Sequence, residues 1–339
     1  MKTIVLDRPE HFTRLETSEP GPLLPGQALL RVRSIGVCGT DLHGYMGRQP
    51  FFEYPRIIGH ELGADVVSIA ADVTNVSVGD RCSVRPYLTC GICIACRRGK
   101  SNCCTTLKCL GVHTDGGMRD FIALPANNLH VANDLTYDQL ALVETLCIGG
   151  HAVDRAVVQP DEHVLVIGAG PIGLGVIEFL RQVTPNIIVM DVSISRLGFC
   201  AEHLGIQRTV VAGENALRQV ESMTNGELPT AVFDATGNPG SMMSAFQYVS
   251  HGGRLVYVGL CQADITFSDP FLHRREITLL ASRNAVAANF DKTIRLIKSG
   301  RIDTRPWITH NATFDTVVEN FPTWLRPDSG TIKAMVHWS

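Results

Sequence analysis

The stretch Val164-Leu-Val-Ile167-Gly168-Ala-Gly170-Pro-Ile-Gly173 decides the fold of the second half of this chain. Its four leading apolar residues are typical of a buried parallel strand, and a helix pattern follows from Ile172 to Val183. The first glycine permits a tight turn, the second lets the backbone approach a pyrophosphate, and the third lets helix and strand pack closely. Amides at the helix N-terminus would bind the phosphates. The stretch therefore predicts a dinucleotide site with the loop residues Gly168, Gly170, Pro171, Ile172 and Gly173.

The alternation of apolar runs with helix patterns continues downstream. Further strand candidates are 187–190, 209–211, 231–234 and 255–258, and the helix candidates include 195–204 and 215–223. Strands that alternate with helices in this way indicate a doubly wound parallel sheet. The pattern begins near residue 153 and ends near Arg283. We therefore expect residues 153–285 to form an α/β cofactor domain of the Rossmann type.

Asp191 follows the apolar run 187–190 and lies 18 residues after Gly173. A carboxylate at this point binds the ribose hydroxyls of a nicotinamide cofactor. It would repel the additional phosphate of NADP, so the sequence favours NAD. Arg196 could instead serve that phosphate, although we prefer to interpret it as a helix-surface side chain near the adenine. A flavin is the other dinucleotide to consider, and the mid-chain position of the loop argues for nicotinamide. Two further candidates for cofactor contact follow the strand candidates 231–234 and 255–258, namely Thr236 and Gly259.

Four cysteines lie close together in Cys90-Gly-Ile-Cys93-Ile-Ala-Cys96 and, seven residues later, Cys104. The glycines, Lys100 and Asn102 among them suit a tight loop. Four thiolates at this spacing can surround one ion tetrahedrally, and thiolate is the ligand that zinc takes in closed structural sites. A disulfide knot or four unrelated buried thiols are the alternatives. We expect a structural zinc site.

The first part of the chain has a different character. Short β-type runs at 28–35, 63–69 and 81–84 are separated by turns rich in Gly, Pro and Asp, which predicts an irregular β domain. A helix is expected to begin near Thr136. After the cofactor domain, a helix at 291–298 ends at Gly300, and the tail at 332–336 has the pattern of a strand that fits the first domain. We therefore expect a discontinuous domain made of residues 1–152 and 286–339.

A second group of possible metal ligands comprises Cys38, His60 and Glu61. Cysteine, histidine and glutamate together can hold a catalytic zinc and leave room for water or substrate. Each alone has a plainer interpretation, as a buried small thiol or a structural histidine. Glu144 stands in an apolar helix pattern, where a carboxylate is costly to bury unless it is paired or bound to metal. An exposed helix face is the alternative for Glu144.

Composition narrows the class of protein. The chain has 339 residues, 45% of them hydrophobic, and a formal net charge of −3, which argues against a nucleic-acid or anionic membrane surface. The N-terminus lacks the pattern of a signal peptide, and glycines and a proline interrupt the longest apolar stretch, at 163–180. Eleven cysteines without an export signal indicate a reducing compartment. We expect a cytoplasmic protein that binds a small molecule.

At this point the residues resemble a known family, the zinc-dependent medium-chain dehydrogenases/reductases. The segments that carry the resemblance are 59–63, 78–81, the four-cysteine segment, 111–117 and the 168–173 loop. The resemblance implies a GroES-like catalytic domain beside the Rossmann domain, two zinc ions per chain, NAD, and an alcohol dehydrogenase activity. Within the family the chain is most similar to the polyol, threonine and sugar-acid branch. Gln49-Pro-Phe-Phe-Glu-Tyr-Pro-Arg56 and Ala281-Ser-Arg-Asn284 resemble L-galactonate 5-dehydrogenases most.

The resemblance also implies roles for single residues. Cys38 and His60 match catalytic zinc ligands, Glu61 matches the acid that joins them, and Glu144 matches an acid that approaches the metal in some members. Thr40 matches the hydroxyl that bonds the substrate alcohol, His43 the outer end of the proton relay, and Asp41 a support of the site. Cys90, Cys93, Cys96 and Cys104 match the structural ligands, which leaves Cys103 as an extra thiol. One departure is Thr145, where the family usually has proline.

The resemblance implies oxidation of a secondary hydroxyl of a sugar acid to a ketone by hydride transfer. The substrate carboxylate would need a cation, for which Arg283 and His113 are candidates, and both could equally be structural. A polyol (sorbitol-like) or L-threonine dehydrogenase is the alternative, and a catalytically silent nucleotide-binding regulator is a more remote one. Cofactor domains of this family often pair through an edge strand, so we expect a homodimer or homotetramer that pairs through the region 267–280.

Overall fold

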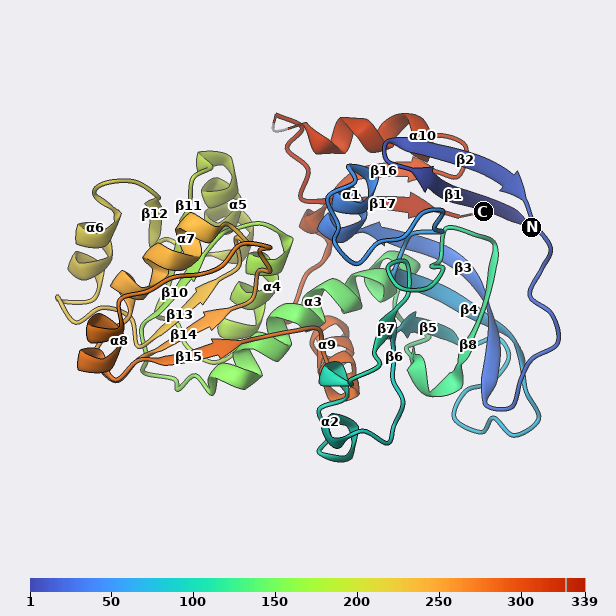
Figure 1. The fold of residues 1–339 in the computed structure, drawn as a ribbon, viewed down its shortest axis with the longest axis horizontal. Coiled ribbons are helices and arrows are strands. Elements are labelled where there is room, and N and C mark those ends of the chain that lie inside the picture. The colour runs from blue at the N-terminus through green and yellow to red at the C-terminus, as the bar shows by residue number, and fades with distance from the viewer. Residues whose placement is uncertain (327, 339) are drawn as a thin grey trace. The chain divides into compact units, whose positions relative to one another are not determined.

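The computed structural model describes residues 1–326 and 328–338 (Figure 1). The chain divides into two compact units, and the first segment of the chain and its tail belong to the same one. Unit 1 comprises Met1–Thr145 and Val286–Ser339, and unit 2 comprises Leu146–Ala285. The first division falls inside a long helix, α3 (Tyr137–Ala156), ahead of the expected boundary at 152/153.

Unit 1 is built on a seven-stranded, mostly antiparallel sheet with the order β16-β17-β3-β4-β5-β9, and β8 pairs with β3 off this path. These strands are β3 (Gln27–Val37), β4 (Glu61–Ile69), β5 (Arg81–Val84), β8 (Phe121–Pro125), β9 (Leu129–Val131), β16 (Ile308–Thr313) and β17 (Lys333–His337). Two-stranded sheets are formed by β1 (Lys2–Arg8) with β2 (His11–Glu16), and by β6 (Tyr87–Leu88) with β7 (Lys108–Cys109). The predicted β domain is thus confirmed, and its core is a cluster of apolar side chains that includes Ile35, Leu62 and Val336.

Several helices accompany these sheets. They are α1 (Gly39–Tyr45), α2 (Ile94–Arg97), α3, α9 (Ala287–Lys298), α10 (Val317–Asn320) and short 3-10 turns at Ser101–Cys103, Ala126–Asn128, Arg305–Trp307 and Phe321–Leu325. The predicted start of α3 near Thr136 is confirmed, because the Thr136 N–H donates to Gln139 Oε1 (2.9 Å) and the Gln139 N–H donates to Thr136 Oγ1 (3.2 Å). The helix expected at 291–298 begins earlier, at Ala287. The Asn289 carboxamide oxygen accepts from the Val286 N–H (3.0 Å) and caps it there.

The tail strand β17 lies between β16 and β3, parallel to the first and antiparallel to the second. Ala334 pairs with Val37 and Met335 pairs with Gly36, next to the residues that lead into α1. Lys333, which precedes Ala334, is therefore buried in the core of unit 1 beside the end of β3.

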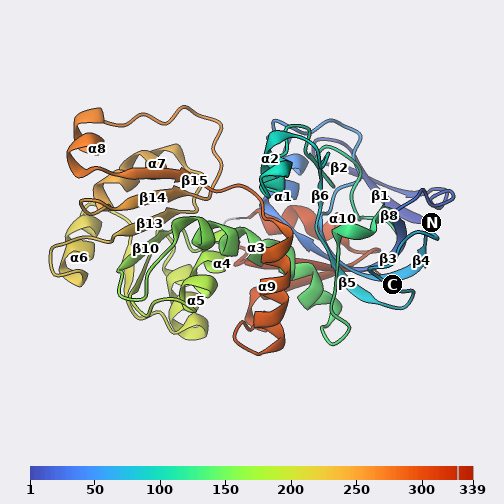
Figure 2. The ribbon, with the colours of Figure 1, turned by 90° about the horizontal axis from the view of Figure 1, so that it is seen from below.

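Unit 2 is a six-stranded parallel sheet with the order β12-β11-β10-β13-β14-β15. The strands are β10 (Val164–Ile167), β11 (Ile187–Asp191), β12 (Thr209–Val211), β13 (Ala231–Asp234), β14 (Arg254–Tyr257) and β15 (Thr278–Ala281). The helices are α4 (Pro171–Leu180), α5 (Ile194–Leu204), α6 (Ala216–Met223), α7 (Pro239–Ser244), α8 (Asp269–Arg275) and a 3-10 turn at Ala245–Tyr248. Figure 2 shows α7 and α8 on one face of the sheet and α4 and α5 on the other. Because both faces are covered, β10, β11 and β13 are buried along their whole length. The predicted doubly wound fold is confirmed.

No helix in the described part of the chain is long and apolar enough to cross a membrane.

Candidate active site

The four cysteines of the segment 90–104 come together in unit 1. Their sulfur atoms all lie within 4.8 Å of one another. Two of the thiols accept backbone N–H groups, from Cys90 to Cys104 Sγ (3.3 Å) and from Cys93 to Cys90 Sγ (3.4 Å). The loop thus wraps around a common centre in the way that a closed metal site requires.

The chemistry of these thiols suits a cation. Hydrogen bonds from backbone amides, first that of Cys96, lower the pKa of Cys93 to about 5. The amide of Cys90 likewise lowers the pKa of Cys104. No disulfide joins any of the eleven cysteines, all of which lie in the described part of the chain. Cys103 is exposed and stands outside the group. Burial raises the pKa of Cys96 to about 12, so the stabilised thiolates are those of Cys93 and Cys104. Four converging thiols, two of them with lowered pKa values, fit a structural zinc ion.

A second group unites Cys38, His60 and Glu61, whose ligand atoms also lie within 4.8 Å of one another. Cys38 follows β3 and forms the N-cap of α1, while His60 and Glu61 stand at the start of β4. The register of these strands pairs Gly36 with Glu61. A Cβ on Gly36 would lie 2.0 Å from Glu61 Oε2, so glycine is needed there to leave room for the carboxylate. The structure thus brings together three ligands that are separate in sequence.

Asp41 supports this group, as the resemblance implied. Its side chain is buried, Oδ2 accepts from the Cys38 N–H (2.9 Å), and Oδ1 accepts from the Gly59 N–H (3.3 Å). Asp41 Oδ1 also lies 3.6 Å from His60 Nδ1. The Asp41 carboxylate therefore holds the backbone amide of Cys38 and that of Gly59, which precedes His60. Its negative charge also lies next to the His60 imidazole.

The surroundings of His60 favour a positive charge. Burial alone would lower the pKa of His60, but the charges of Asp41 and Cys38 raise it well above its ordinary value. His60 Nδ1 is buried and makes no hydrogen bond with any of the residues that the structure describes. A half-buried thiol, a buried imidazole and a buried carboxylate fit a zinc ion with a coordination position left for water or substrate.

The Glu61 carboxylate has a partner that sequence reasoning missed. Lys333 Nζ donates to both of its oxygens, at 2.6 and 2.7 Å, and also to the Val37 carbonyl oxygen (3.2 Å) and Thr145 Oγ1 (3.1 Å). Both Lys333 and Glu61 are at most 1% exposed. The Thr145 hydroxyl, at the position where the family usually has proline, thus bonds an ammonium group in the site. The signal that could have revealed the pair was a lysine inside the apolar tail strand, because a buried lysine needs a partner.

The structure does not bring Glu144 into the group of three. Its Oε1 accepts a hydrogen bond from the buried Tyr87 hydroxyl, a second residue that sequence reasoning missed. Burial raises the pKa of Glu144, and nearby Glu61 adds to this effect, while His60 opposes it. Glu144 is therefore a buried acid next to the site with a partner of its own.

Thr40 and His43 both lie on α1, directly after Cys38. Thr40 is half-buried and His43 is exposed. Residues three apart on a helix share a face, so the two side chains lead from the neighbourhood of Cys38 toward solvent.

The dinucleotide loop of unit 2 has the conformation that its glycines predict. Gly168 has φ +96°, which favours glycine, and a Cβ on Gly173 would lie 1.7 Å from the Gly168 carbonyl oxygen. Space is open around Gly170, where the nearest atom to an added Cβ is an Arg196 nitrogen at 3.7 Å. Pro171 opens α4, and no side chain caps that helix. Its amides are thus available to a pyrophosphate.

The remaining cofactor candidates surround this loop at the carboxyl ends of the strands. Asp191 Oδ2 accepts from the Ala169 N–H (2.6 Å) and Oδ1 accepts from the Ser193 N–H (2.8 Å), so the acid is fixed against the loop. Thr236 Cγ2 is the atom nearest to an added Cβ on Gly168, at 3.0 Å. Gly259 approaches Gly237 so closely that a Cβ would lie 2.3 Å from the Gly237 nitrogen. The predicted cofactor residues therefore surround the dinucleotide loop at the carboxyl ends of the parallel strands.

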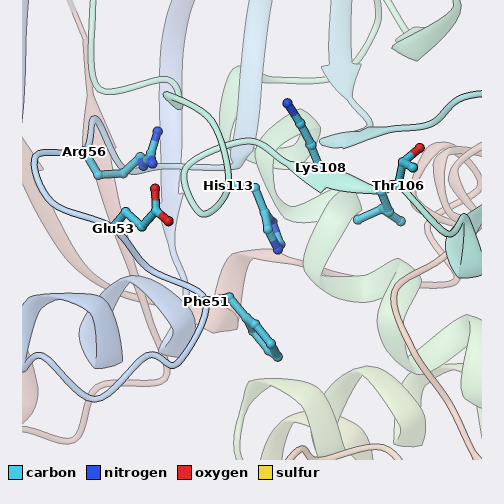
Figure 3. Close-up of a pocket in the computed structure, with 7 residues that line it drawn as sticks. Phe51, Glu53, Arg56, Thr106, Lys108 and His113 are labelled. Atoms are coloured by element: carbon cyan, nitrogen blue, oxygen red, sulfur yellow. The ribbon is translucent and has the colours of Figure 1, made fainter.

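The two candidates for the substrate carboxylate lie in different units. His113 belongs to unit 1, where it lines a pocket of about 330 Å³ (Figure 3). Arg283 follows β15 in unit 2 and is exposed.

Comparison with known proteins covers both units. A family model of the alcohol dehydrogenase GroES-like domain matches residues 24–134, and one of the zinc-binding dehydrogenases matches residues 171–299. L-galactonate-5-dehydrogenase of Escherichia coli (strain K12) is 36% identical over 99% of this chain and 98% of its own length. Sorbitol dehydrogenase of Bacillus subtilis (strain 168) is 29% identical over 99% of this chain and 97% of its own.

Solved structures agree with the family models. The alcohol dehydrogenase RspB of E. coli CFT073, in complex with NADH, superposes with a TM-score of 0.92 at 29% identity, over 99% of each chain. The expected enzyme class, the zinc dependence and the use of a nicotinamide cofactor are thereby confirmed. Because the matches run through both the β unit and the dinucleotide unit, the chain belongs to the zinc-dependent medium-chain dehydrogenase/reductase family, in which a GroES-like domain accompanies a Rossmann domain.

Proposed function

We propose that this enzyme oxidises a secondary hydroxyl of a sugar acid of the L-galactonate type to a ketone, with zinc and NAD. The observation that carries the proposal is the group of Cys38, His60 and Glu61, which offers three ligands and a field that favours a cation. The sugar-acid substrate is supported by the 36% identity to L-galactonate-5-dehydrogenase over nearly the whole chain.

We assign the roles in the site as follows. Cys38, His60 and Glu61 would hold the catalytic zinc, and Cys90, Cys93, Cys96 and Cys104 the structural one. When bound, zinc is a Lewis acid that lowers the pKa of a substrate hydroxyl, and NAD is the hydride acceptor. Thr40 would take a hydrogen bond from the substrate hydroxyl, and His43, further along the same helix face, would pass the proton to solvent. We propose Glu144 as an additional acid of the site. Its carboxylate would either bind the catalytic zinc or keep the hydrogen bond from the Tyr87 hydroxyl.

A substrate panel tests the reaction. Hexonates should reduce NAD faster, in kcat/KM, than sorbitol, galactitol or L-threonine at equal concentration. A preference for a polyol would support the alternative suggested by the 29% identity to sorbitol dehydrogenase. Tight NADH binding without turnover on any of these alcohols would point to the silent regulator instead and contradict the proposal.

We propose that Asp191 makes NAD the preferred cofactor. Its carboxylate, at the end of β11, accepts from the Ala169 N–H of the dinucleotide loop, where it would bind ribose hydroxyls and repel a 2′-phosphate. Asp191→Asn keeps the shape and removes the charge. We expect kcat/KM with NAD to fall roughly tenfold and that with NADP to rise, because a hydrogen bond to a charged group contributes about 1.5–3 kcal/mol.

The control for this variant is Arg196→Met, which removes the cation beside Gly170 of the dinucleotide loop. If Arg196 is a helix-surface residue, as we interpret it, the ratio of the two kcat/KM values stays within about threefold of the wild type, well under the tenfold that 1.4 kcal/mol represents. An unchanged ratio in Asp191→Asn would show that the acid does not select the cofactor.

We also propose that the protein is a cytoplasmic homodimer or homotetramer. The edge strand β15 is largely exposed, with Leu279 at 40%, and Phe267 nearby is 48% exposed. An unpaired edge with apolar side chains favours strand pairing between two copies. Sedimentation at micromolar concentration tests this, and a monomer would contradict it.

A further inference from the structure

Lys333 brings a buried ammonium group to the proposed catalytic metal site. Its side chain is 1% exposed and belongs to β17, where the next residue, Ala334, pairs with Val37 of β3. Val37 directly precedes Cys38, the proposed thiolate ligand. The pairing of the tail strand with β3 therefore places a positive charge beside the metal ligands.

Protein atoms satisfy this ammonium group completely. Lys333 Nζ lies 2.6 and 2.7 Å from the two Glu61 oxygens, 3.2 Å from the Val37 carbonyl oxygen and 3.1 Å from Thr145 Oγ1. An ammonium group has three donors, so the acceptors around it suffice without water. All of these residues belong to unit 1. Lys333 is therefore held at one position within the site.

The groups around Lys333 are mostly anionic. Burial alone would lower the pKa of Lys333, but the charges of Glu61 and Cys38 raise it above its ordinary value, and the charge of Glu144 adds to this effect. Lys333 is therefore a positive charge that acts on several acidic groups of the site, and Glu61 is only the nearest of them.

The Glu61 carboxylate is confined between two neighbours. On one side, a Cβ on Gly36 would lie 2.0 Å from Glu61 Oε2, so the carboxylate lies directly against this glycine. On the other side, both carboxylate oxygens accept from Lys333. One Glu61 oxygen nevertheless lies within 4.8 Å of a ligand atom of Cys38 and of His60. The same carboxylate thus faces both the ammonium group and the place where a metal ion would bind.

We propose that Lys333 is a positioning residue that shares the Glu61 carboxylate with the catalytic zinc, weakens the hold of Glu61 on that ion and leaves the site with a net positive charge. A carboxylate that already bonds an ammonium group through both oxygens is a weaker donor to a second cation, and the two cations repel each other. The inference rests on the proposed metal group of Cys38, His60 and Glu61, and it does not depend on which alcohol is the substrate.

The shared carboxylate has a consequence for the reaction. The charges of a Cys38 thiolate and a Glu61 carboxylate together equal that of a divalent ion, and Lys333 adds one positive charge to this balance. A positive charge near a hydroxyl group favours its ionised form. Lys333 would therefore help a substrate alcohol in the site to lose its proton.

Zinc affinity tests the proposal, because a lysine that only supported the fold would loosen the site when removed. Competition with a chelator, on the full-length enzyme, gives the Kd of each zinc, and the one that is lost in Cys38→Ser is the catalytic one. In Lys333→Met we expect its Kd to fall at least about tenfold, which is 1.4 kcal/mol. The zinc at the four cysteines should keep its Kd within about threefold.

Two further variants complete the test. Lys333→Gln keeps a hydrogen-bond donor for Glu61 without the charge, so it should show the same fall in Kd even if the methionine variant does not fold. Thr145→Val is the matched control, because it removes one acceptor of the same ammonium group but no charge. Its Kd for the catalytic zinc should stay within about threefold of the wild type. Zinc-saturated Lys333→Gln should also have a kcat at least about tenfold lower than that of the wild type.

The outcomes separate this inference from the proposed function. If the wild type binds two zinc ions but the Kd is unchanged or higher in the Lys333 variants, or falls equally in Thr145→Val, Lys333 does not weaken the hold on the ion. An unchanged kcat in zinc-saturated Lys333→Gln would contradict the effect of its charge on the reaction. If the wild type binds zinc at the four cysteines alone, the proposed metal group itself fails, and the role of Lys333 fails with it.

Discussion

Replacing Cys38 by serine should reduce kcat at least about 1,000-fold while NADH binding stays within about twofold of the wild type. A serine hydroxyl stays protonated at neutral pH and is a poor zinc ligand, so the group of three loses its soft anion. The loss should exceed the roughly 10- to 100-fold effect of removing residues that only support ligands. NADH binding should be spared because the dinucleotide loop belongs to unit 2.

Two measurements are needed for this variant. Steady-state reduction of NAD gives kcat, and titration of NADH fluorescence gives binding. The matched control is Cys103→Ser, the same chemical change at an exposed thiol outside both metal groups. Activity of Cys38→Ser near that of Cys103→Ser would show that position 38 does not carry the reaction.

Replacing Lys333 by methionine should destabilise the protein by about 3–5 kcal/mol when zinc has been removed. The reason is that both oxygens of the Glu61 carboxylate bond this ammonium group in a region that is at most 1% exposed. Without Lys333, a buried charge has no compensating partner. We expect Tm to fall by on the order of 10 °C in chelator. Zinc should recover part of the loss, because the ion would neutralise the same carboxylate.

The control is a second lysine–carboxylate ion pair with the same N–O distance. Lys298 Nζ lies 2.6 Å from Asp134 Oδ1, and Lys333 Nζ lies 2.6 Å from Glu61 Oε1. The side chains of Lys298 and Asp134, however, are 36% and 65% exposed. Lys298→Met should therefore change Tm far less, because water and salt screen an exposed pair. The double variant Lys333→Met/Glu61→Gln should be more stable than Lys333→Met alone. Equal Tm values for the two single variants would contradict the account of the buried pair.

Features set by neighbouring residues could be predicted from the sequence. The dinucleotide loop is one, since Gly168 and Gly173 each meet a local steric demand, while Gly170 keeps the space beside the loop open. The alternation of strands and helices in unit 2 is another. Boundaries were less accurate: the helix expected to end at Val183 ends at Leu180, and α9 begins at Ala287 because of the Asn289 cap. Periodicity alone does not show where side-chain hydrogen bonds end a helix.

The site could be predicted only in part, for reasons of chain topology. Cys38, His60 and Glu61 were named as a group, and the structure brings them together. The Lys333–Glu61 pair joins residues 272 positions apart and depends on β17 pairing beside β3, which no local pattern encodes.

Glu144 was named as a candidate ligand, but its partner Tyr87 lies 57 positions away and could not be read from the helix pattern. The pocket next to β7 is a second case. His113 was named as a candidate from the sequence, whereas only the structure shows that Lys108 lines the same pocket.

The central claim is that one chain holds two zinc ions in two sulfur-containing groups with different tasks. Anomalous diffraction at the zinc absorption edge, from crystals of enzyme purified without chelator, tests it most directly. Our account predicts two anomalous peaks per chain, one among the sulfurs of Cys90, Cys93, Cys96 and Cys104 and one between Cys38 and His60. A peak at the four cysteines without one at Cys38, in enzyme that reduces NAD, would contradict it.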